Sequence, residues 1–242
     1  MSVLLLLLAA PLQSWGASAR FARRTTEPVP TKSGVLGLLA AAQGRDRTAD
    51  LSDLAALRFG VRVDQPGTRI RDFQTATHAD SGKAMPVSER FYLADAVFVA
   101  AVEGDDALID ELHTAVRAPV YLPYLGRRSC PPARPLDLGV RTGADLRQVL
   151  HTEPWHASAW YQRRRRSEQR VDVEVFLDAD PRGGPRDSLR DQPLSFDPRH
   201  RRYGLRTVRS ETVSVANPQA RKARRVTVPA HDPFDALDEE IA

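Results

Sequence analysis

The sequence predicts an α+β protein with a ferredoxin-like β-α-β-β-α-β domain, a projecting β-hairpin and a mostly β C-terminal extension. Three observations support this fold class. The chain begins with a continuous apolar run, two helical patterns alternate with apolar strands up to residue 140, and a pair of polar, strand-like arms interrupts that order near residue 80. We expect the domain to span residues 1–145 and the extension to span residues 146–242.

The first element is the apolar run Val3–Ala9, which Pro11 ends. A continuous apolar run of this length is typical of a strand buried on both faces. It is too short to cross a bilayer. It also lacks the preceding Lys or Arg that a signal peptide carries. We therefore expect a central strand, no contact with a membrane and a cytoplasmic protein.

A helix and a second strand follow. The apolar stretch 35–42 lies between Thr31 or Ser33, either of which is suited to cap a helix, and Gly44, which is suited to end it. Leu57–Val63 alternates in the manner of a strand. These patterns predict the first α-helix and the second strand of the domain.

Residues 68–93 differ from the rest of the domain because they contain few apolar side chains. Two strand-like arms, Thr68–Ala76 and Val87–Leu93, flank the turn-rich residues Asp80–Lys83. A hairpin with little to bury is expected to project from the body.

The second half of the domain begins with the apolar strand Asp95–Val102 and continues through a helix over Ala107–Val116 to a short strand near Leu136–Val140. A loop rich in Pro, Tyr and Arg, residues 119–135, precedes that last strand. The helix is expected to bury one face, comprising Leu108, Leu112, Ala115 and Val116.

The pattern weakens after residue 150. Val171–Leu177 alternates as a strand, and Arg206–Val215 is a candidate partner for it. We expect loop between them, over Asp178–Arg202, because this segment is rich in Pro, Gly, Asp and Arg. The acidic tail His231–Ala242 completes the extension.

Charge is unevenly distributed along the chain. Thirty-two of the 35 basic residues are arginine, and residues 163–225 alone carry 17 basic and 9 acidic side chains, whereas the last 17 residues carry five acidic side chains and no basic ones. A GC-rich genome would enrich arginine without functional cause. A local excess is also what a polyanion-binding surface requires, and guanidinium groups bind phosphates and stack on bases.

Several kinds of chemistry have no support in the sequence. Thr31–Gly34 resembles the end of a phosphate-binding loop, but Glu27 stands where that motif needs glycine. The six histidines show no metal-ligand spacing, and the single cysteine, Cys130, excludes a disulfide framework and is expected to be structural. We expect no catalytic residue, no metal and no cofactor.

Two arginine-containing segments have more than one interpretation. The loop 123–132 combines Tyr124 with Arg127 and Arg128, and it is either a site that stacks and holds single-stranded RNA or an ordinary solvated connection. The run Arg163–Arg166 is either a solvated charge run or a nonspecific contact with nucleic acid.

Five segments, in this order along residues 3–140, together resemble the CasD family of CRISPR-associated proteins. The segments are Leu6–Gly16, Pro30–Gly44, Arg71–Thr75, Glu89–Val99 and Tyr121–Pro131. The resemblance implies a non-catalytic subunit of a type I-E Cascade surveillance complex that caps the 5′ handle of the guide RNA (crRNA). It also implies a ferredoxin-like fold that RNA-recognition modules share, a β-hairpin thumb, the backbone subunit CasC and the large subunit CasA as partners, and target DNA reached through the complex.

The resemblance and the residue patterns together predict an RNA-binding surface. We expect Lys32 and Ser33 to bind handle phosphates and the loop residues to hold or stack nucleotides, while thumb residues meet the guide where handle and spacer join. Trp15 is either core or RNA-facing. The predicted RNA-binding residues are Lys32, Ser33, Arg71, Gln74, Arg90, Tyr124, Arg127 and Arg128.

Two other functions remain open at this stage. One is a metal-independent endoribonuclease that processes CRISPR repeat RNA, because acid–base residues need not be adjacent in sequence. The other is a free-standing RNA-binding module of the same fold.

Overall fold

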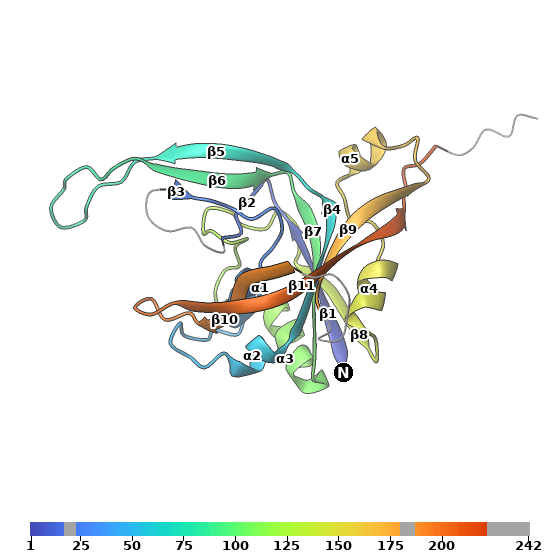
Figure 1. Ribbon diagram of the computed structural model, residues 1–242, viewed down its shortest axis with the longest axis horizontal. Helices are drawn as coiled ribbons and strands as arrows, with labels where there is room; N and C mark the ends of the chain where they lie inside the picture. The colour runs from blue at the N-terminus through green and yellow to red at the C-terminus, as the bar shows by residue number, and fades with distance from the viewer. Residues whose placement is uncertain (17–22, 180–186, 222–242) are drawn as a thin grey trace, which may run out of the picture.

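The computed structural model describes residues 1–16, 23–179 and 187–221, which form two β-sheets and the helices packed on them (Figure 1). The larger sheet has the strand order β10-β11-β9-β4-β7-β1-β8, and the smaller sheet has β6 at its centre. The strands are β1 (Ser2–Ala9), β2 (Leu12–Gln13), β3 (Arg23–Arg24), β4 (Arg58–Gln65), β5 (Thr68–Gln74), β6 (Ser88–Ala94), β7 (Val97–Gly104), β8 (Asp137–Thr142), β9 (Arg170–Asp178), β10 (Asp187–Ser195) and β11 (Arg202–Ala216).

Helices cover both faces of the larger sheet. Side chains of α1 and α3 share one hydrophobic cluster with one face, and α4 shares a second cluster with the other. Among the described residues, no helix has the length and apolar character needed to cross a membrane. The helices are α1 (Lys32–Ala42), α2 (Ser52–Ala56), α3 (Asp106–Arg117), α4 (Leu146–Thr152) and α5 (Ala159–Arg164).

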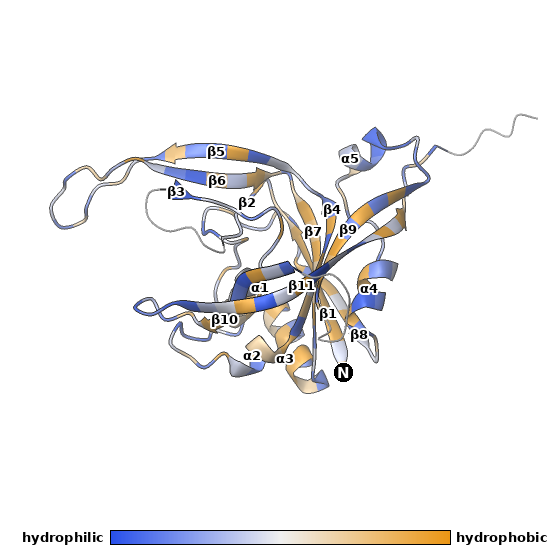
Figure 2. Ribbon diagram, in the orientation of Figure 1, coloured by the Kyte–Doolittle hydropathy of each residue, from blue (hydrophilic) through white to orange (hydrophobic). Residues whose placement is uncertain are grey.

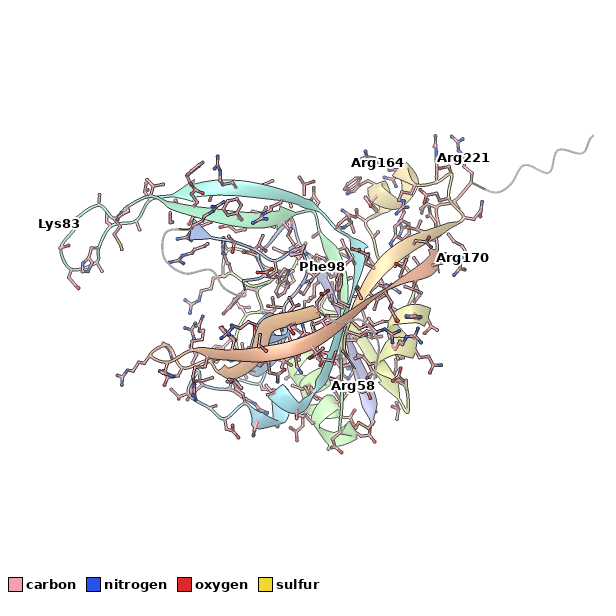
Figure 3. All side chains as sticks on the ribbon, viewed as in Figure 1. Arg58, Lys83, Phe98, Arg164, Arg170 and Arg221 are labelled. Atoms are coloured by element: carbon pink, nitrogen blue, oxygen red, sulfur yellow. The ribbon has the colours of Figure 1, made fainter. Side chains whose placement is uncertain are left out.

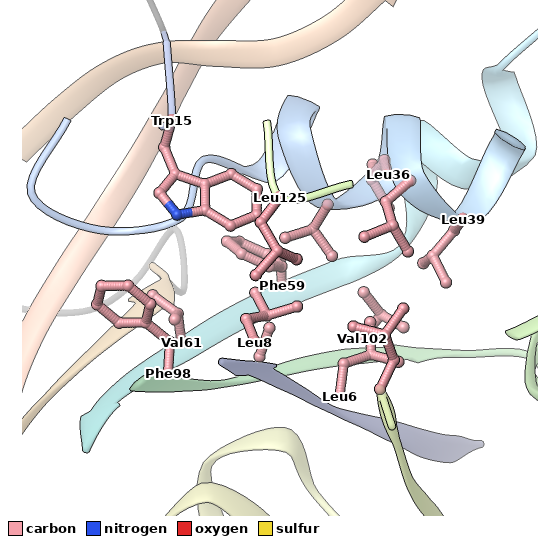
Figure 4. Close-up of a cluster of buried hydrophobic side chains, with 14 of the residues drawn as sticks. Leu6, Leu8, Trp15, Leu36, Leu39, Phe59, Val61, Phe98, Val102 and Leu125 are labelled. Atoms are coloured by element: carbon pink, nitrogen blue, oxygen red, sulfur yellow. The ribbon is translucent and has the colours of Figure 1, made fainter. Parts of the chain in front are cut away.

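Strand β1 lies at the centre of the core, and all eight of its residues are buried. Because side chains alternate along a strand, its even-numbered leucines point to α1 and α3, while Val3 and Leu5 point to α4. Figure 4 shows Leu6 and Leu8 of β1 against Leu36 and Leu39 of α1. Each fully buried leucine contributes about 1.5–3 kcal/mol relative to an exposed one. The predicted central strand is confirmed.

The predicted order β-α-β-β-α-β is present as β1, α1, β4, β7, α3 and β8. These four strands are neighbours in the order β8-β1-β7-β4, and each adjacent pair is antiparallel. Thr31 caps α1 as expected, since its Oγ1 accepts a hydrogen bond from the backbone of Gly34 at 3.2 Å. The α3 face differs in detail: Ile109 is fully buried, whereas Leu108 and Ala115 are half-buried.

Trp15 belongs to the core. Its side chain is fully buried beside α1 and Leu125, and its indole N–H donates to Gln13 Oε1 at 3.1 Å (Figure 4). The sequence left open whether Trp15 is a core residue or faces RNA, and the structure shows that it is a core residue.

The C-terminal strands extend the larger sheet, because β9 pairs with β4. The predicted pairing of β9 with β11 is confirmed in an antiparallel register. The expected loop over 178–202 is wrong in part, since β10 lies within it and pairs with β11. As an edge strand with two register shifts, β10 tolerates Pro193, and that proline concealed it in the sequence. The tail 231–242 lies outside the described residues, and the boundary near residue 145 stays a prediction.

The buried side chain of Arg62 fixes α4 to the sheet. Its guanidinium donates to both carboxylate oxygens of Asp64, with Nε to Oδ1 at 2.6 Å. It also donates to carbonyls in the last turn of α4 and immediately after it, namely those of Leu150, Glu153 and Pro154 at 2.6–2.8 Å. All five guanidinium N–H groups are therefore satisfied. The negative, C-terminal end of the α4 dipole also faces the positive charge of Arg62.

Glu211 of β11 makes a second link to α4. Its carboxylate accepts hydrogen bonds from Arg147 at 2.8 Å and His151 at 2.5 Å, both on α4, and from Arg209 on its own strand. Burial alone would raise the pKa of Glu211, but these hydrogen bonds outweigh burial and lower the pKa to about 2.

We expect Arg62→Ala to lower the free energy of unfolding by about 3–5 kcal/mol, because it leaves Asp64 as an unpaired buried charge. Urea denaturation measures this. Arg47→Ala is the matched control, since Arg47 is exposed and its loss should change stability by less than about 0.5 kcal/mol. Equal effects of the two substitutions would contradict the role of Arg62.

The lowered pKa of Glu211 makes the stability of the protein depend on pH. A carboxyl whose pKa is lower folded than unfolded stabilises the protein fully above its unfolded value of about 4.5, and this contribution disappears as the pH falls towards about 2. The difference in thermal stability between the wild type and Glu211→Gln should therefore be largest above pH 5 and shrink in that window. A difference independent of pH would argue against these ionic contacts.

Candidate nucleic-acid interface

The hairpin formed by β5 and β6, here called the thumb hairpin, extends away from the body (Figure 1). Its antiparallel register places Arg71 opposite Phe91 and Ile70 opposite Tyr92. Because directly paired residues share a face, the hairpin has two distinct surfaces. We call them the Phe91 face and the Tyr92 face. The predicted projecting hairpin is thus present, with arms at the expected positions.

The Phe91 face presents stacked arginines. The guanidinium carbons of Arg69 and Arg23 lie 4.9 and 5.4 Å from the centre of the Phe91 ring, and that of Arg71 lies 4.8 Å from the ring of Phe73. Such cation–π contacts contribute about 0.5–1 kcal/mol each at exposed sites and orient the guanidinium plane. Among the described residues the carboxylate close to these arginines is that of Glu89, which lies 4.0 Å from both Arg23 and Arg71. This face therefore carries a net positive charge.

The Tyr92 face meets the loop that follows α3. The Arg127 guanidinium lies 4.6 Å from the Tyr92 ring centre, and its Nη2 donates to the backbone oxygen of Arg24 at 2.9 Å. Arg24 pairs in register with Arg90. Nε of Arg90 and Nη1 of Arg127 are buried, and neither finds an acceptor among the described residues. An unsatisfied buried donor costs about 1–3 kcal/mol, and more when it is charged, so these atoms are suited to donate to a bound anion.

The loop is held in place by backbone contacts with the core. Leu125 is fully buried, its N–H donates to the carbonyl of Cys130 at 2.8 Å, and its carbonyl accepts from Ser14 at 3.1 Å. Gly126 has φ +84°, and a Cβ there would lie 1.7 Å from the carbonyl oxygen of Ser14. Only glycine fits this approach. The fixed loop leaves Tyr124 half-buried and Arg128 exposed.

Cys130 is a packing residue, as expected. It is buried, and this burial raises the pKa of its thiol, so the thiol stays protonated at neutral pH. A protonated thiol is a poor nucleophile. The described residues also contain no group of three or more His, Cys, Asp or Glu side chains placed to hold a metal ion.

Lys32 and Ser33 lie elsewhere, at the buried start of α1. The ammonium of Lys32 is 3.1 Å from Asp178 Oδ2, and its backbone N–H donates to Asp191 Oδ2 at 2.8 Å. Arg206 holds both carboxylates, with nitrogen–oxygen distances of 2.7–2.8 Å. Burial lowers the pKa of Lys32, although Asp178 opposes this shift. Carboxylates of the chain itself thus occupy the place where phosphate was expected, and we leave Lys32 and Ser33 out of the surface proposed below.

The structure therefore divides the predicted residues. Arg90 and Arg127 both lie at the Tyr92 face, and Gln74 lies on the same face, where its amide donates to Asp72 at 2.9 Å. Arg71 lies on the opposite face. The sequence analysis missed Arg23, Arg24 and Arg69 as well as both ring platforms; the alternation of Arg69, Arg71 and Phe73 along one arm was the available signal.

Residues 3–209 match the family described as CRISPR-associated protein (Cas_Cas5). The chain belongs to the Cas5 family. The resemblance drawn from the five sequence segments is thus confirmed at the level of the family. The mixed α+β class predicted from the sequence is also that of the solved structures to which this Cas5-family chain is similar.

Individual relatives agree with this assignment. The CRISPR system Cascade subunit CasD of Escherichia coli (strain K12) is 38% identical over 169 residues, which cover 62% of this chain and 75% of the relative. A solved structure described as a Cas protein is 37% identical with a TM-score of 0.67, covering 91% of this chain and 98% of its own. A chain from a CRISPR RNA-guided surveillance complex is 35% identical with a TM-score of 0.74, covering 92% and 95% respectively.

We expect Gly126→Ala to displace the loop, because the new methyl group would collide with the carbonyl of Ser14. The free energy of unfolding of Gly126→Ala should fall by more than about 1–2 kcal/mol, which is the cost of placing a non-glycine residue in left-handed backbone alone. Gly143→Ala is the control: Gly143 has φ +67° but open space around its Cβ position. Chemical denaturation of both variants measures the difference, and equal losses would contradict the steric argument.

Proposed function

We propose that this Cas5-family chain is the subunit of a Cascade surveillance complex that binds the 5′ handle of the guide RNA without cutting it. The observation that carries the proposal is the set of arginines held on aromatic rings at the thumb hairpin and the 121–131 loop. The structural likeness to a chain from an RNA-guided surveillance complex supports it. CasC and CasA are the proposed neighbours in the complex, and target DNA is reached through it.

The proposed contacts follow from the chemistry of the two thumb faces. Arg90 and Arg127 have guanidinium N–H groups without an acceptor among the described residues, so we assign them to handle phosphates. Exposed Arg128 and half-buried Tyr124 extend this surface along the loop and are suited to phosphate contact and base stacking. Arg71 and Gln74, on opposite faces of the hairpin, would meet the guide farther out along the thumb.

A non-catalytic role is proposed because most of the described histidines, the most common general bases, are held by the body and lie away from this surface. His113, His151 and His156 pair with carboxylates of the body, at 3.1, 2.5 and 2.9 Å. On the described thumb residues the histidine is His78, which is exposed near the hairpin tip. RNA cleavage without a metal needs a general base within hydrogen-bond reach of the attacking hydroxyl.

We expect Arg90→Gln combined with Arg127→Gln to weaken binding of repeat-derived RNA at least about ten-fold. The slope of log affinity against log salt should fall by about 1.4, since each single-strand phosphate contact contributes about 0.7. Arg199→Gln with Arg201→Gln is the control, because both residues are exposed in the β10–β11 connection. The exposed pair Arg71→Gln and Arg128→Gln tests the other proposed RNA contacts, on the thumb hairpin and the loop, without altering buried groups. Unchanged affinity in both thumb variants would contradict the assignment.

The endoribonuclease alternative is tested directly. Purified protein incubated with labelled repeat RNA and a chelator should leave the RNA intact, because we assign the surface to binding alone. A specific cut that persists through purification and disappears in His78→Ala would establish cleavage and reject the non-catalytic proposal.

A further inference from the structure

A second cluster of arginines lies at the other end of the molecule, where α5, the start of β9 and the end of β11 meet. Figure 3 shows Arg164, Arg170 and Arg221 at this corner, and Figure 2 shows one turn of α5 as strongly hydrophilic. The backbone N–H of Arg221 donates to the carbonyl of Arg166 at 2.8 Å, which joins the segments. We call this surface the α5 patch; it comprises Trp160, Arg163, Arg164, Arg166, Arg170 and Arg221, all exposed.

The positive charge of the α5 patch is poorly neutralised within the described residues. Arg163, Arg164 and Arg166 form no ion pair there, whereas their neighbour Arg165 binds Glu168 with nitrogen–oxygen distances of 2.6–2.9 Å. Arg170 donates to Ser214, a neutral partner. Adjacent like charges repel one another, so an anion bound across them is favoured. On β9 the outward acidic residue nearest to Arg170 is Asp172, two positions along the same face, and it forms no ion pair with Arg170 among the described residues.

An exposed tryptophan stands beside these arginines. Trp160 retains 47% of its surface, whereas Trp15 and Trp155 retain 0 and 4%. On α5 it precedes Arg163 and Arg164 by three and four residues, a spacing that places all three on neighbouring parts of the helix surface. Its ring packs edge-to-face with Tyr161, with centres 5.6 Å apart, and Tyr161 packs in the same way on buried Trp155. The indole is therefore held in place rather than free to rotate.

We propose that the α5 patch is a second nucleic-acid site, one that binds single strands without regard to sequence. Guanidinium groups bind the phosphates, and an unpaired base stacks on the indole of Trp160. The proposed ligand is a single strand because the bases of a duplex stack on each other and leave no free face for the indole of Trp160. The patch shares no element with the thumb hairpin or the 121–131 loop, so the two sites are separable.

The burial of the other two tryptophans provides a direct readout. All three tryptophans of the chain are described, and only Trp160 is exposed. An oligodeoxythymidine of about 20 nucleotides, added to the full-length protein, should quench tryptophan emission to saturation, since base stacking on an indole quenches it. A strand bound at the thumb hairpin finds no exposed tryptophan on which a base could stack, and Trp160→Phe distinguishes any indirect change in Trp15 emission.

Substitutions distinguish binding at the α5 patch from a nonspecific effect of the protein's net charge. Arg163→Gln, Arg164→Gln and Arg166→Gln together should weaken quenching at least about ten-fold and lower the salt slope by about 2, from three phosphate contacts. The matched control is Arg199→Gln, Arg201→Gln and Arg202→Gln, which removes the same charge from the β10–β11 hairpin and should leave the affinity within about two-fold. The affinity of the thumb hairpin for repeat RNA is expected to be unchanged in the patch variant. The two sites can therefore be tested independently.

Trp160→Phe completes the test. It should abolish the quenching and weaken binding of a fluorescently labelled oligonucleotide measured by anisotropy, while thermal stability confirms that the fold is intact. The proposal is overturned if no quenching occurs, if the control triple substitution weakens binding as much as the patch variant, or if a duplex of the same length competes as well as the single strand.

Discussion

The structure depends on one constraint: β1 is apolar at every position after Ser2, so both of its faces must be removed from water. Helices α1 and α3 cover one face, and α4 covers the other, where side chains of β9 join the same cluster. A four-stranded sheet with two helices on one side would leave Val3 and Leu5 open to solvent. The C-terminal extension is therefore part of the same hydrophobic core, and it continues the sheet from β4 instead of forming separate layers.

Buried ionic groups fix where that extension lies. Arg62 joins β4 to the end of α4, and Arg206 joins β11 to Asp178 and Asp191, which in turn bind the start of α1. Buried pairs of this kind often contribute little more stability than apolar residues of the same size would. Their geometry is demanding, however, and we interpret them as fixing the register of segments that are distant in sequence.

Local patterns were enough to predict β1, α1, β4, β7, α3, β8 and the thumb hairpin, because apolar runs, a helix cap and a polar hairpin determine those elements over short distances. The short elements β2, β3 and α2 carry no such pattern and were missed. Local patterns also failed where a partner lies far along the chain. Lys32 precedes Asp178 by 146 residues, so its sequence context resembled a phosphate site while its ammonium is neutralised internally. Alternation suggested the arms of the thumb hairpin, but only the strand register shows that Arg71 and Arg90 lie on opposite faces. A proline concealed β10 for a similar reason, since tolerance of proline depends on a strand being at an edge.

The aromatic rings beneath the thumb arginines have an energetic consequence for recognition. Immobilising a long, flexible side chain at an interface costs about 0.5–1.5 kcal/mol. Arg69, Arg71 and Arg127 are oriented by Phe91, Phe73 and Tyr92 through contacts within the fold itself, so much of that entropy is lost during folding and not during association. Lysine at these positions would keep the charge but lose the planar contact. The strong preference of this chain for arginine over lysine is thus compatible with a surface that is rigid before its ligand arrives.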